Sequence, residues 1–223
     1  MEKTRAVALL ILLLGVTGPA SAQILAPSRD EVPLTDLLEI LLLERELVAV
    51  DAESGGQTAV DLHLGERVLW SGARGVVGVV LTDQRMLAVA VDSGSWRETR
   101  YQQGERAPEA AMLGDRVALL ITSRRALAFN AGGASLAEYR FGPGETLLSS
   151  RVGENVGVVV TDRKALGFSP SAGGFFASRL HLRERIGSVE TRSNLATVTT
   201  NRRVLIFRAP SGAWSERALD LGS

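Results

Sequence analysis

Short apolar runs alternate with brief polar stretches along most of the chain. Four segments share nearly the same pattern: VVLTDQRMLAV at 79–89, LLITSRRALAF at 119–129, VVVTDRKALGF at 158–168 and TVTTNRRVLIF at 197–207. A continuous apolar run of this length that ends in a polar turn is typical of a strand buried on both faces. Each segment therefore predicts two buried strands that are joined by a tight turn.

The four segments recur at a fixed period. Their threonines, Thr82, Thr122, Thr161 and Thr200, are separated by 40, 39 and 39 residues. A fifth copy, ILLLERELVAV at 40–50, has Leu43 in the threonine position. A second landmark recurs in step with the first, as Gly-Glu at 65–66, 104–105 and 144–145 and as Arg-Glu at 183–184. Two landmarks that keep one period indicate a tandem structural repeat.

Within one repeat the pattern predicts four short strands. In the third copy these strands span 106–113, 116–122, 125–131 and 135–141, and the last alternates polar and apolar residues as a half-exposed strand does. A pair of small residues precedes the fourth strand in every copy: Gly55-Gly56, Ser93-Gly94, Gly132-Gly133, Gly173-Gly174 and Ser211-Gly212. Glycine in these pairs would supply the positive φ that tight hairpins require.

Four strands in about 40 residues form the blade of a β-propeller, and the chain resembles the β-propeller superfamily over residues 29–223. The resemblance implies an all-β fold: a single domain at 23–223, a five-bladed β-propeller of four-stranded antiparallel blades. The repeats are expected at 29–65, 66–104, 105–144, 145–183 and 184–223. No WD40 or kelch signature is present. The alternative is an open β-solenoid or twisted sheet, and the nearly constant repeat length favours a ring.

The first 22 residues have the order of a secretory signal peptide. Charged residues at Glu2, Lys3 and Arg5 precede an apolar run, which ends before the small residues Ala20, Ser21 and Ala22. We expect cleavage after Ala22; the alternative, an uncleaved anchor, has an apolar run too short to span a bilayer comfortably. Because Arg greatly outnumbers Lys, a bacterial source is expected, with the mature protein periplasmic or secreted.

Composition narrows the chemistry. The chain has no cysteine, which excludes disulfides, thiolate metal sites and a cysteine nucleophile. Its 25 Lys and Arg residues balance 25 Asp and Glu residues, so a nucleic-acid partner and an anionic-membrane footprint are disfavoured. We predict no cofactor, no metal site, and no stable membrane span after signal cleavage.

The turn between the second and third strands carries basic residues in every repeat: Arg45; Gln84 and Arg85; Arg124 and Arg125; Arg163 and Lys164; Arg202 and Arg203. In a propeller these turns share one end of the blades with the blade-to-blade links, which carry Glu66, Glu105, Glu145 and Glu184. One interpretation is an anion-binding ring for carboxylated or sulfated glycans, led by Arg124, Arg163 and Arg202. The other, which we favour because acid and base recur together and should cancel, is a set of structural salt bridges.

Other candidate residues carry weaker signals. Trp70, on a first strand near the expected channel, is a candidate ligand contact, whereas Trp96, Leu136, Phe175 and Trp214 hold equivalent positions that favour packing against the adjacent blade. His63 and His181 are expected on separate blades, which argues against a shared metal ion. The first-strand acids Asp36, Glu39, Glu109 and Glu190, with Asp115 and Glu154, form no recognisable catalytic set, and no catalytic residue is assigned.

The sequence therefore predicts an exported, non-enzymatic binding or scaffolding propeller of the cell envelope with a protein or glycan partner. Two alternatives stay open. One is an exported glycan-acting hydrolase with carboxylates at the central channel, and the other is a lectin-like sugar binder.

Overall fold

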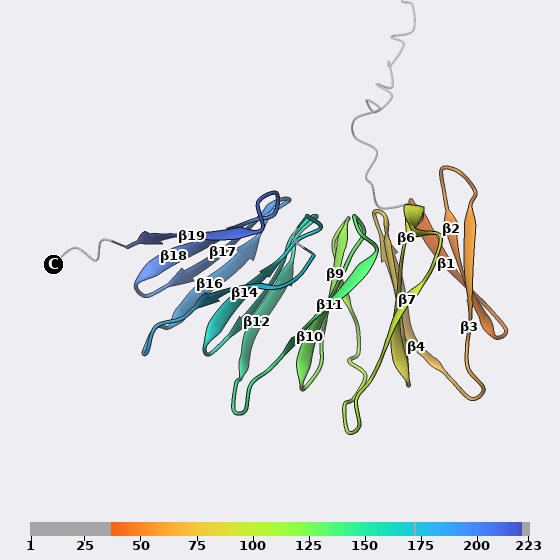
Figure 1. Ribbon diagram of the computed structural model, residues 1–223, viewed down its shortest axis with the longest axis horizontal. Coiled ribbons are helices and arrows are strands. Elements are labelled where there is room, and N and C mark those ends of the chain that lie inside the picture. Colours follow the sequence, from red (N-terminus) through yellow and green to blue (C-terminus); the bar gives the residue numbers. More distant parts are fainter. Residues whose placement is uncertain (1–36, 172, 220–223) are drawn as a thin grey trace, which may run out of the picture. The chain divides into compact units, whose positions relative to one another are not determined.

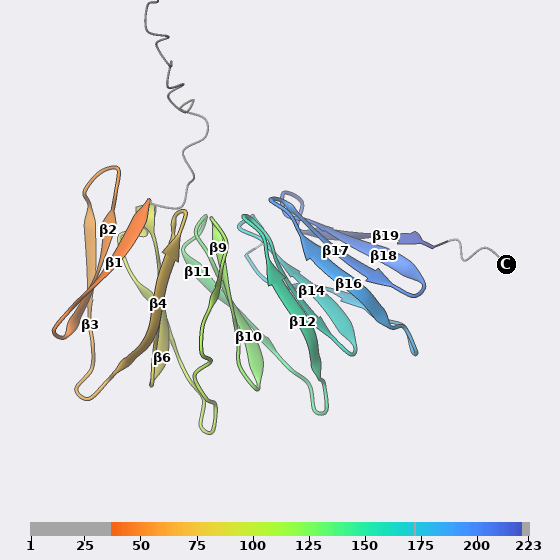
Figure 2. The same ribbon diagram turned by 180° about the vertical axis from the view of Figure 1, so that it is seen from behind.

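The computed structural model describes residues 37–171 and 173–219, coloured along the chain in Figures 1 and 2. The predicted signal peptide and the first strand expected for the first repeat lie outside the described residues. The described residues contain no helix long and apolar enough to cross a bilayer.

The described chain forms nineteen strands in five sheets (Figure 1). The first sheet contains β1 (Leu38–Leu43), β2 (Glu46–Asp51) and β3 (Gln57–Asp61), and the second β4 (Val68–Arg74), β5 (Val77–Thr82), β6 (Arg85–Ala90) and β7 (Arg97–Arg100). The third contains β8 (Met112–Leu113), β9 (Val117–Ile121), β10 (Arg125–Asn130) and β11 (Ser135–Arg140). The fourth contains β12 (Leu147–Val152), β13 (Gly157–Thr161), β14 (Lys164–Phe168) and β15 (Phe176–Arg179), and the fifth β16 (Ile186–Thr191), β17 (Leu195–Thr200), β18 (Arg203–Arg208) and β19 (Ala213–Ala218).

Every strand pairs antiparallel with the next strand of its own sheet, so each sheet is a simple up-and-down blade. Four sheets have four strands, and the first has three among the described residues because β1 corresponds to the second strand of the other sheets. The prediction of an all-β fold built from five antiparallel β-propeller blades is confirmed.

One predicted strand is much shorter than expected. The third repeat should begin with a strand at 106–113, but only Met112–Leu113 pairs with β9. Pro108 lies in the missing part, and because proline has no backbone N–H it cannot donate to a ladder hydrogen bond. This segment is the clearest departure from the repeat.

The core lies between consecutive sheets rather than within one of them. Side chains from one sheet's second and third strands meet those of the next, as Leu81 and Met86 meet Leu120 and Phe129. The same contact recurs between the third and fourth sheets and between the fourth and fifth. In the second sheet β5 and β6 are buried at every position, as the continuous apolar runs predict.

Glycine allows consecutive blades to approach closely at the turns between first and second strands. A side chain at Gly114 would overlap the backbone carbonyl of Gly153, and one at Gly153 would overlap that of Arg192. Backbone hydrogen bonds join the same turns, as when the Arg116 N–H donates to the Glu154 carbonyl at 2.9 Å. These glycines therefore set the spacing between blades.

The hairpins before the fourth strands require positive φ at one position in all five sheets. Gly55, Gly94, Gly173 and Gly212 hold it with φ between 57° and 70°. In the third sheet the position belongs to Ala134, with φ 43°, and not to Gly132 or Gly133. The glycine prediction is thus correct for four hairpins and wrong for the third.

A substitution at Gly114 tests the spacing. We expect Gly114→Ala to lower the free energy of unfolding by roughly 1–3 kcal/mol, because the added methyl group meets backbone that cannot rotate away. Chemical denaturation measures the change. Gly133→Ala is the matched control, since a methyl group there makes only ordinary contacts, 3.5 Å from the Asn130 Oδ1 atom. Equal stability of the two variants would contradict the interpretation.

Candidate functional site

The links between blades are tight turns, each closed by its own glutamate. In the first link the Glu66 carboxylate accepts a hydrogen bond from the backbone N–H of His63 at 2.8 Å, and the Glu66 N–H donates to the His63 carbonyl at 3.1 Å. Gly65 has φ 79°, and in the last link Arg183 takes the same left-handed conformation with φ 65°. The recurrent Gly-Glu landmark is therefore a turn that aims a carboxylate back at the sheet.

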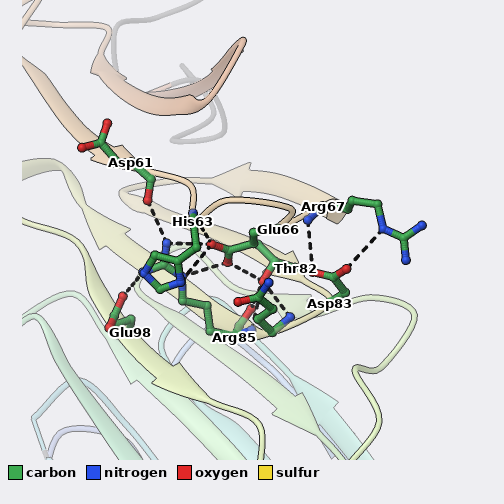
Figure 3. Close-up of polar contacts among 9 residues, drawn as sticks. Asp61, His63, Glu66, Arg67, Thr82, Asp83, Arg85 and Glu98 are labelled. Atoms are coloured by element: carbon green, nitrogen blue, oxygen red, sulfur yellow. Dashed lines mark hydrogen bonds and ion pairs between the residues drawn. The ribbon is translucent and has the colours of Figure 1, made fainter.

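Each carboxylate meets a threonine and a basic residue from the following sheet, and we call this group the Glu–Thr–Arg cluster. Figure 3 shows the copy formed by Glu66, Thr82 and Arg85. The Thr82 hydroxyl donates to Glu66 at 2.7 Å, and Arg85 donates to both carboxylate oxygens, from Nε at 2.8 Å and from Nη2 at 3.0 Å. The side chains of Arg85 and Glu66 are 3% and 0% exposed. Arg85 and Glu66 thus form a buried, bidentate ion pair within the cluster.

The arginine also joins one blade to the next. Arg85 Nη2 donates to the backbone carbonyl of Asp61 in the preceding sheet at 2.8 Å, and Nη1 pairs with Glu98 on the fourth strand of its own sheet (Figure 3). All three nitrogens of the guanidinium group are therefore engaged, and the group bonds the link, its own blade and the blade before it.

The arrangement recurs at the other links. Arg125 pairs with Glu105 at 2.8 Å and donates to the Arg100 carbonyl at 2.7 Å, and Arg203 pairs with Glu184 at 3.0 Å and donates to the Arg179 carbonyl at 2.7 Å. The fourth sheet differs because Lys164 replaces arginine. Its ammonium group donates to the Tyr139 hydroxyl at 2.8 Å, and that hydroxyl lies 3.1 Å from both oxygens of Glu145. Tyrosine thus bridges the distance between the lysine and the glutamate.

The cluster holds its acids ionised. Burial alone would raise the pKa of Glu66, but hydrogen bonds from Arg85, the His63 backbone and Thr82 outweigh it and lower the pKa to about 2. The same balance lowers the pKa of Glu184 to about 2. Burial also opposes the ionisation of Glu105 and Glu145, and their hydrogen bonds again lower the pKa of each. Burial would lower the pKa of Arg85 and Arg125, but hydrogen bonds to the link glutamate and to the glutamate on the fourth strand outweigh it and raise the pKa. The hydrogen bond to Glu184 is the largest cause of the raised pKa of Arg203.

In the three turns that carry two basic residues, the cluster separates one from the other. The second of them is directed at the link glutamate, while the first, Arg124, Arg163 or Arg202, is exposed. Arg163 lies 3.9 Å from Asp162 and donates to the Pro143 carbonyl at 3.0 Å. Within 37–171 and 173–219, Arg124 and Arg202 make no ion pair. The expected cancellation of acid and base therefore takes place inside the cluster and leaves the first arginines on the surface.

A second set of exposed arginines, which the sequence reasoning missed, follows the link glutamates directly. Arg67, Arg106 and Arg185 occupy this position, and Thr146 occupies it in the fourth repeat. Arg67 pairs with Asp83 at 3.2 Å. The sequence contains a pattern that could have identified them, because each of these arginines directly follows a link glutamate and so recurs with the same period. Together with the first arginines of the turns they form what we call the link surface: Arg67, Arg106, Arg124, Arg163, Arg185 and Arg202.

The link surface also carries exposed leucines. Leu64 and Leu182, at the tips of the first and last links, are 85% and 87% exposed. Leu69 and Leu148, near the starts of β4 and β12, are 51% and 53% exposed. A shallow cavity of about 440 Å³ opens in the third repeat, lined by Gly104, Arg106, Ala107, Pro108, Ile121, Thr122 and Ser123. The guanidinium group of Arg124 lies over Gly104, at the edge of this cavity. The irregular segment that contains Pro108 therefore lies between two arginines, Arg106 and Arg124.

The remaining candidates are placed as follows. Trp70 is half-buried and packs with the core between the second and third sheets, its ring against Gly72. Trp96 and Trp214 pack against the preceding blade and donate their indole N–H to the carbonyls of Thr58 and Phe176, at 2.9 and 2.7 Å. Leu136 and Phe175 also pack against core clusters, so the packing interpretation of these four positions is confirmed.

The acids and histidines of the sequence analysis lie on different elements. Glu39 is on β1, Glu190 on β16 and Glu109 in the irregular segment before β8, while Asp36 lies outside the described residues. Asp115 pairs with Arg74 at 2.8 Å. His63 lies 3.5 Å from Glu66. In the part of the chain that the structure describes, no three His, Asp or Glu side chains gather as a metal site would require.

Comparisons with known proteins give only distant structural resemblances. No protein-family model and no curated protein sequence matches the chain. Solved structures that it resembles include Prp20p of Saccharomyces cerevisiae, a study of which describes binding to Gsp1p and histones (10% identity, 76% of this chain and 56% of that chain, TM-score 0.38). Human WBSCR16 matches with 11% identity over 74% and 56% of the two chains (TM-score 0.41), and apo AztD of Citrobacter koseri with 14% over 82% and 60% (TM-score 0.35). The chain spans a little over half the length of these structures.

The cluster predicts an acid-sensitive fold. Because the pKa values of Glu66 and Glu184 are lowered from 4.5 to about 2, their stabilisation is complete above pH 4.5 and is lost as the pH falls toward 2. We expect the free energy of unfolding to fall over this range by roughly 3 kcal/mol for each carboxylate. Urea denaturation at several pH values measures it. Glu66→Gln should be less stable at pH 7 and lose less on acidification, whereas the exposed control Glu53→Gln should follow the native profile; an unchanged Glu66→Gln profile would refute the assignment.

Proposed function

We propose that the protein is an exported, non-enzymatic binding or scaffolding β-propeller of the bacterial cell envelope, which holds an acidic protein partner on the link surface. The observation that carries the proposal is the division of charge at the links. Each link glutamate accepts its hydrogen bonds inside a buried cluster. Among the described residues, the exposed Arg106, Arg124, Arg185 and Arg202 make no ion pair and so keep their positive charge for an external anion, whereas Arg67 and Arg163 lie beside Asp83 and Asp162. Arginine's planar donor group suits carboxylates in particular.

The exposed leucines favour a protein over a glycan. Leu64 and Leu182 stand at the tips of two links and are almost fully exposed, next to the arginines. Sugar-binding surfaces generally use aromatic rings for stacking, whereas the three tryptophans of this chain are half-buried in the sheets. A partner segment that combines acidic and apolar side chains would use both kinds of residue. Export and the envelope location rest on the signal-peptide pattern of residues 1–22.

The rigid blades suit a scaffold. The arginines are carried on tight turns that the buried clusters fix from below, so little conformational entropy is lost when a partner binds. Variation among the repeats, such as the cavity beside Arg106 and Arg124, would supply selectivity.

Replacing three arginines tests the anion-binding part of the proposal. Arg124→Ala, Arg163→Ala and Arg202→Ala together should remove the retention of the protein on a sulfated resin, because the exposed guanidinium groups provide the attraction. A triple variant at Arg97, Arg151 and Arg192, which are exposed at the opposite ends of their strands, should elute at the native salt concentration. Equal retention of the two triple variants would refute the proposal.

The nature of the partner needs a second measurement. A mixed Glu/Leu copolymer should bind more tightly than polyglutamate of equal charge, and the double variant Leu64→Ser, Leu182→Ser should abolish the difference while it leaves binding to the sulfated resin unchanged. Tighter binding of a sulfated polysaccharide than of either polypeptide would favour the glycan alternative instead.

A further inference from the structure

The first and last sheets each expose a face that the other sheets bury. Val80 on β5 is 0% exposed because it packs against the first sheet, and Leu41 on β1 holds the same position one repeat earlier yet is 38% exposed. Leu43, in the threonine position, is 50% exposed, whereas Thr82 is 0% exposed. No described residue therefore covers this face, which we call the outer face of the first sheet.

The last sheet shows the complementary pattern. Along β17 and β18 the burial alternates, because Val198, Leu205 and Phe207 pack against the fourth sheet while their neighbours point away from it. The residues that point away are Leu195, Thr197, Thr199, Val204 and Ile206, all half-buried, and we call their side the outer face of the last sheet. In the second sheet the equivalent positions, from Val77 to Ala88, are fully buried against the third.

The two outer faces are the two halves of one blade-to-blade contact. Wherever consecutive sheets meet, the side of the earlier sheet that corresponds to Val204 and Ile206 packs on the side of the later sheet that corresponds to Leu41 and Val48. Both halves are apolar at their centres. The residues that would meet at the rim also have opposite charge, with Glu39 and Glu46 on the first sheet and Arg208 and Arg217 on the last.

The register of the existing contacts identifies one pair. Lys164 of the fourth sheet donates to the Tyr139 hydroxyl of the third at 2.8 Å. By strand register, Glu46 holds the position of Lys164 in the first sheet, and Arg217, opposite Val204, holds that of Tyr139 in the last. Packing the last sheet on the first as the other sheets pack would therefore place Arg217 against Glu46. In the existing contact the later sheet carries the cation, Lys164, and the earlier sheet the acceptor, Tyr139. In the proposed contact the last sheet carries the cation, Arg217, and the first sheet the acceptor, Glu46, so the pair is again attractive.

We propose that the outer face of the last sheet of one copy docks on the outer face of the first sheet of a second copy. Leu41 and Leu43 are not covered by any described residue of this chain, the last sheet included, and a second copy would supply a face of matching shape and opposite charge. A contact between two different faces is head-to-tail, and each copy offers both halves of it. The contact is independent of the link surface and of the function proposed for it.

Charge reversal tests the proposal on the full chain. The native protein should sediment as an assembly of two or more copies, and Glu46→Arg or Arg217→Glu alone should raise the dissociation constant about tenfold, because each places like charges together. An equimolar mixture of the two variants should recover native association, since the arginine introduced in one copy then faces the glutamate introduced in the other, and the remaining contact keeps its native pair. Recovery on mixing requires a contact between copies.

An apolar pair of variants provides a second readout. Leu41→Asp damages only the outer face of the first sheet and Ile206→Asp only that of the last, so each variant alone should be monomeric and their mixture should form a one-to-one dimer through the intact pair of faces. A native protein that stays monomeric at all concentrations would overturn the proposal. So would recovery in the double variant Glu46→Arg, Arg217→Glu without recovery on mixing the single variants, because that result places the contact within one chain.

Discussion

Buried ion pairs between arginine and glutamate join consecutive blades. A carboxylate as deeply buried as Glu66 is tolerated only when its ion pair and hydrogen bonds replace the lost hydration, and the cluster provides an arginine, a threonine hydroxyl and a backbone N–H for that purpose. Because the partners come from a link, a turn and the preceding blade, all three must be correctly placed before any of them is stabilised. Hydrophobic contact between sheets supplies attraction without a fixed register, whereas the cluster fixes the register.

Two features set the geometry between blades at opposite ends of the strands. At one end the arginine of the cluster bonds to a carbonyl of the blade before it, and at the other end Gly114 and Gly153 let successive turns come into backbone contact. Both contacts oppose sliding along the strands, which the core side chains between the sheets would permit. The fourth sheet shows how far one of them can vary, since Lys164 and Tyr139 together replace a single arginine.

The repeat made most of the fold predictable from the sequence. Threonines at a constant spacing locate the ends of second strands, and continuous apolar runs identify strands that are buried on both faces. The short β8 was not predicted because a single proline, Pro108, outweighed the average pattern of the repeat. Ala134 could not be foreseen either, since the φ of one residue depends on the hairpin register rather than on local composition. For the site, the sequence indicated which residues would gather but not their roles. Arg124 and Arg125 are the same residue type in adjacent positions, so the sequence does not distinguish them. Which of the two is buried depends on the direction in which each side chain points at the start of β10.

Departures from the repeat are where function should be sought, since a residue shared by all blades is sufficiently explained by the contact between blades. The cluster recurs at all four links between the described sheets and so does not need a ligand to explain it. Its consequence for the surface is different. Because the link glutamates are enclosed, Arg106, Arg124, Arg185 and Arg202 have no acidic partner among the described residues, although Arg67 and Arg163 lie beside Asp83 and Asp162. The overall neutrality of the chain therefore hides a local excess of positive charge. The first sheet departs in the opposite sense, with Leu43 and Glu46 where the cluster needs threonine and arginine. The first sheet therefore lacks the cluster but has an apolar outer face with an acidic residue, Glu46, at its rim. We expect the surface that packs on it to carry a basic residue at the facing position.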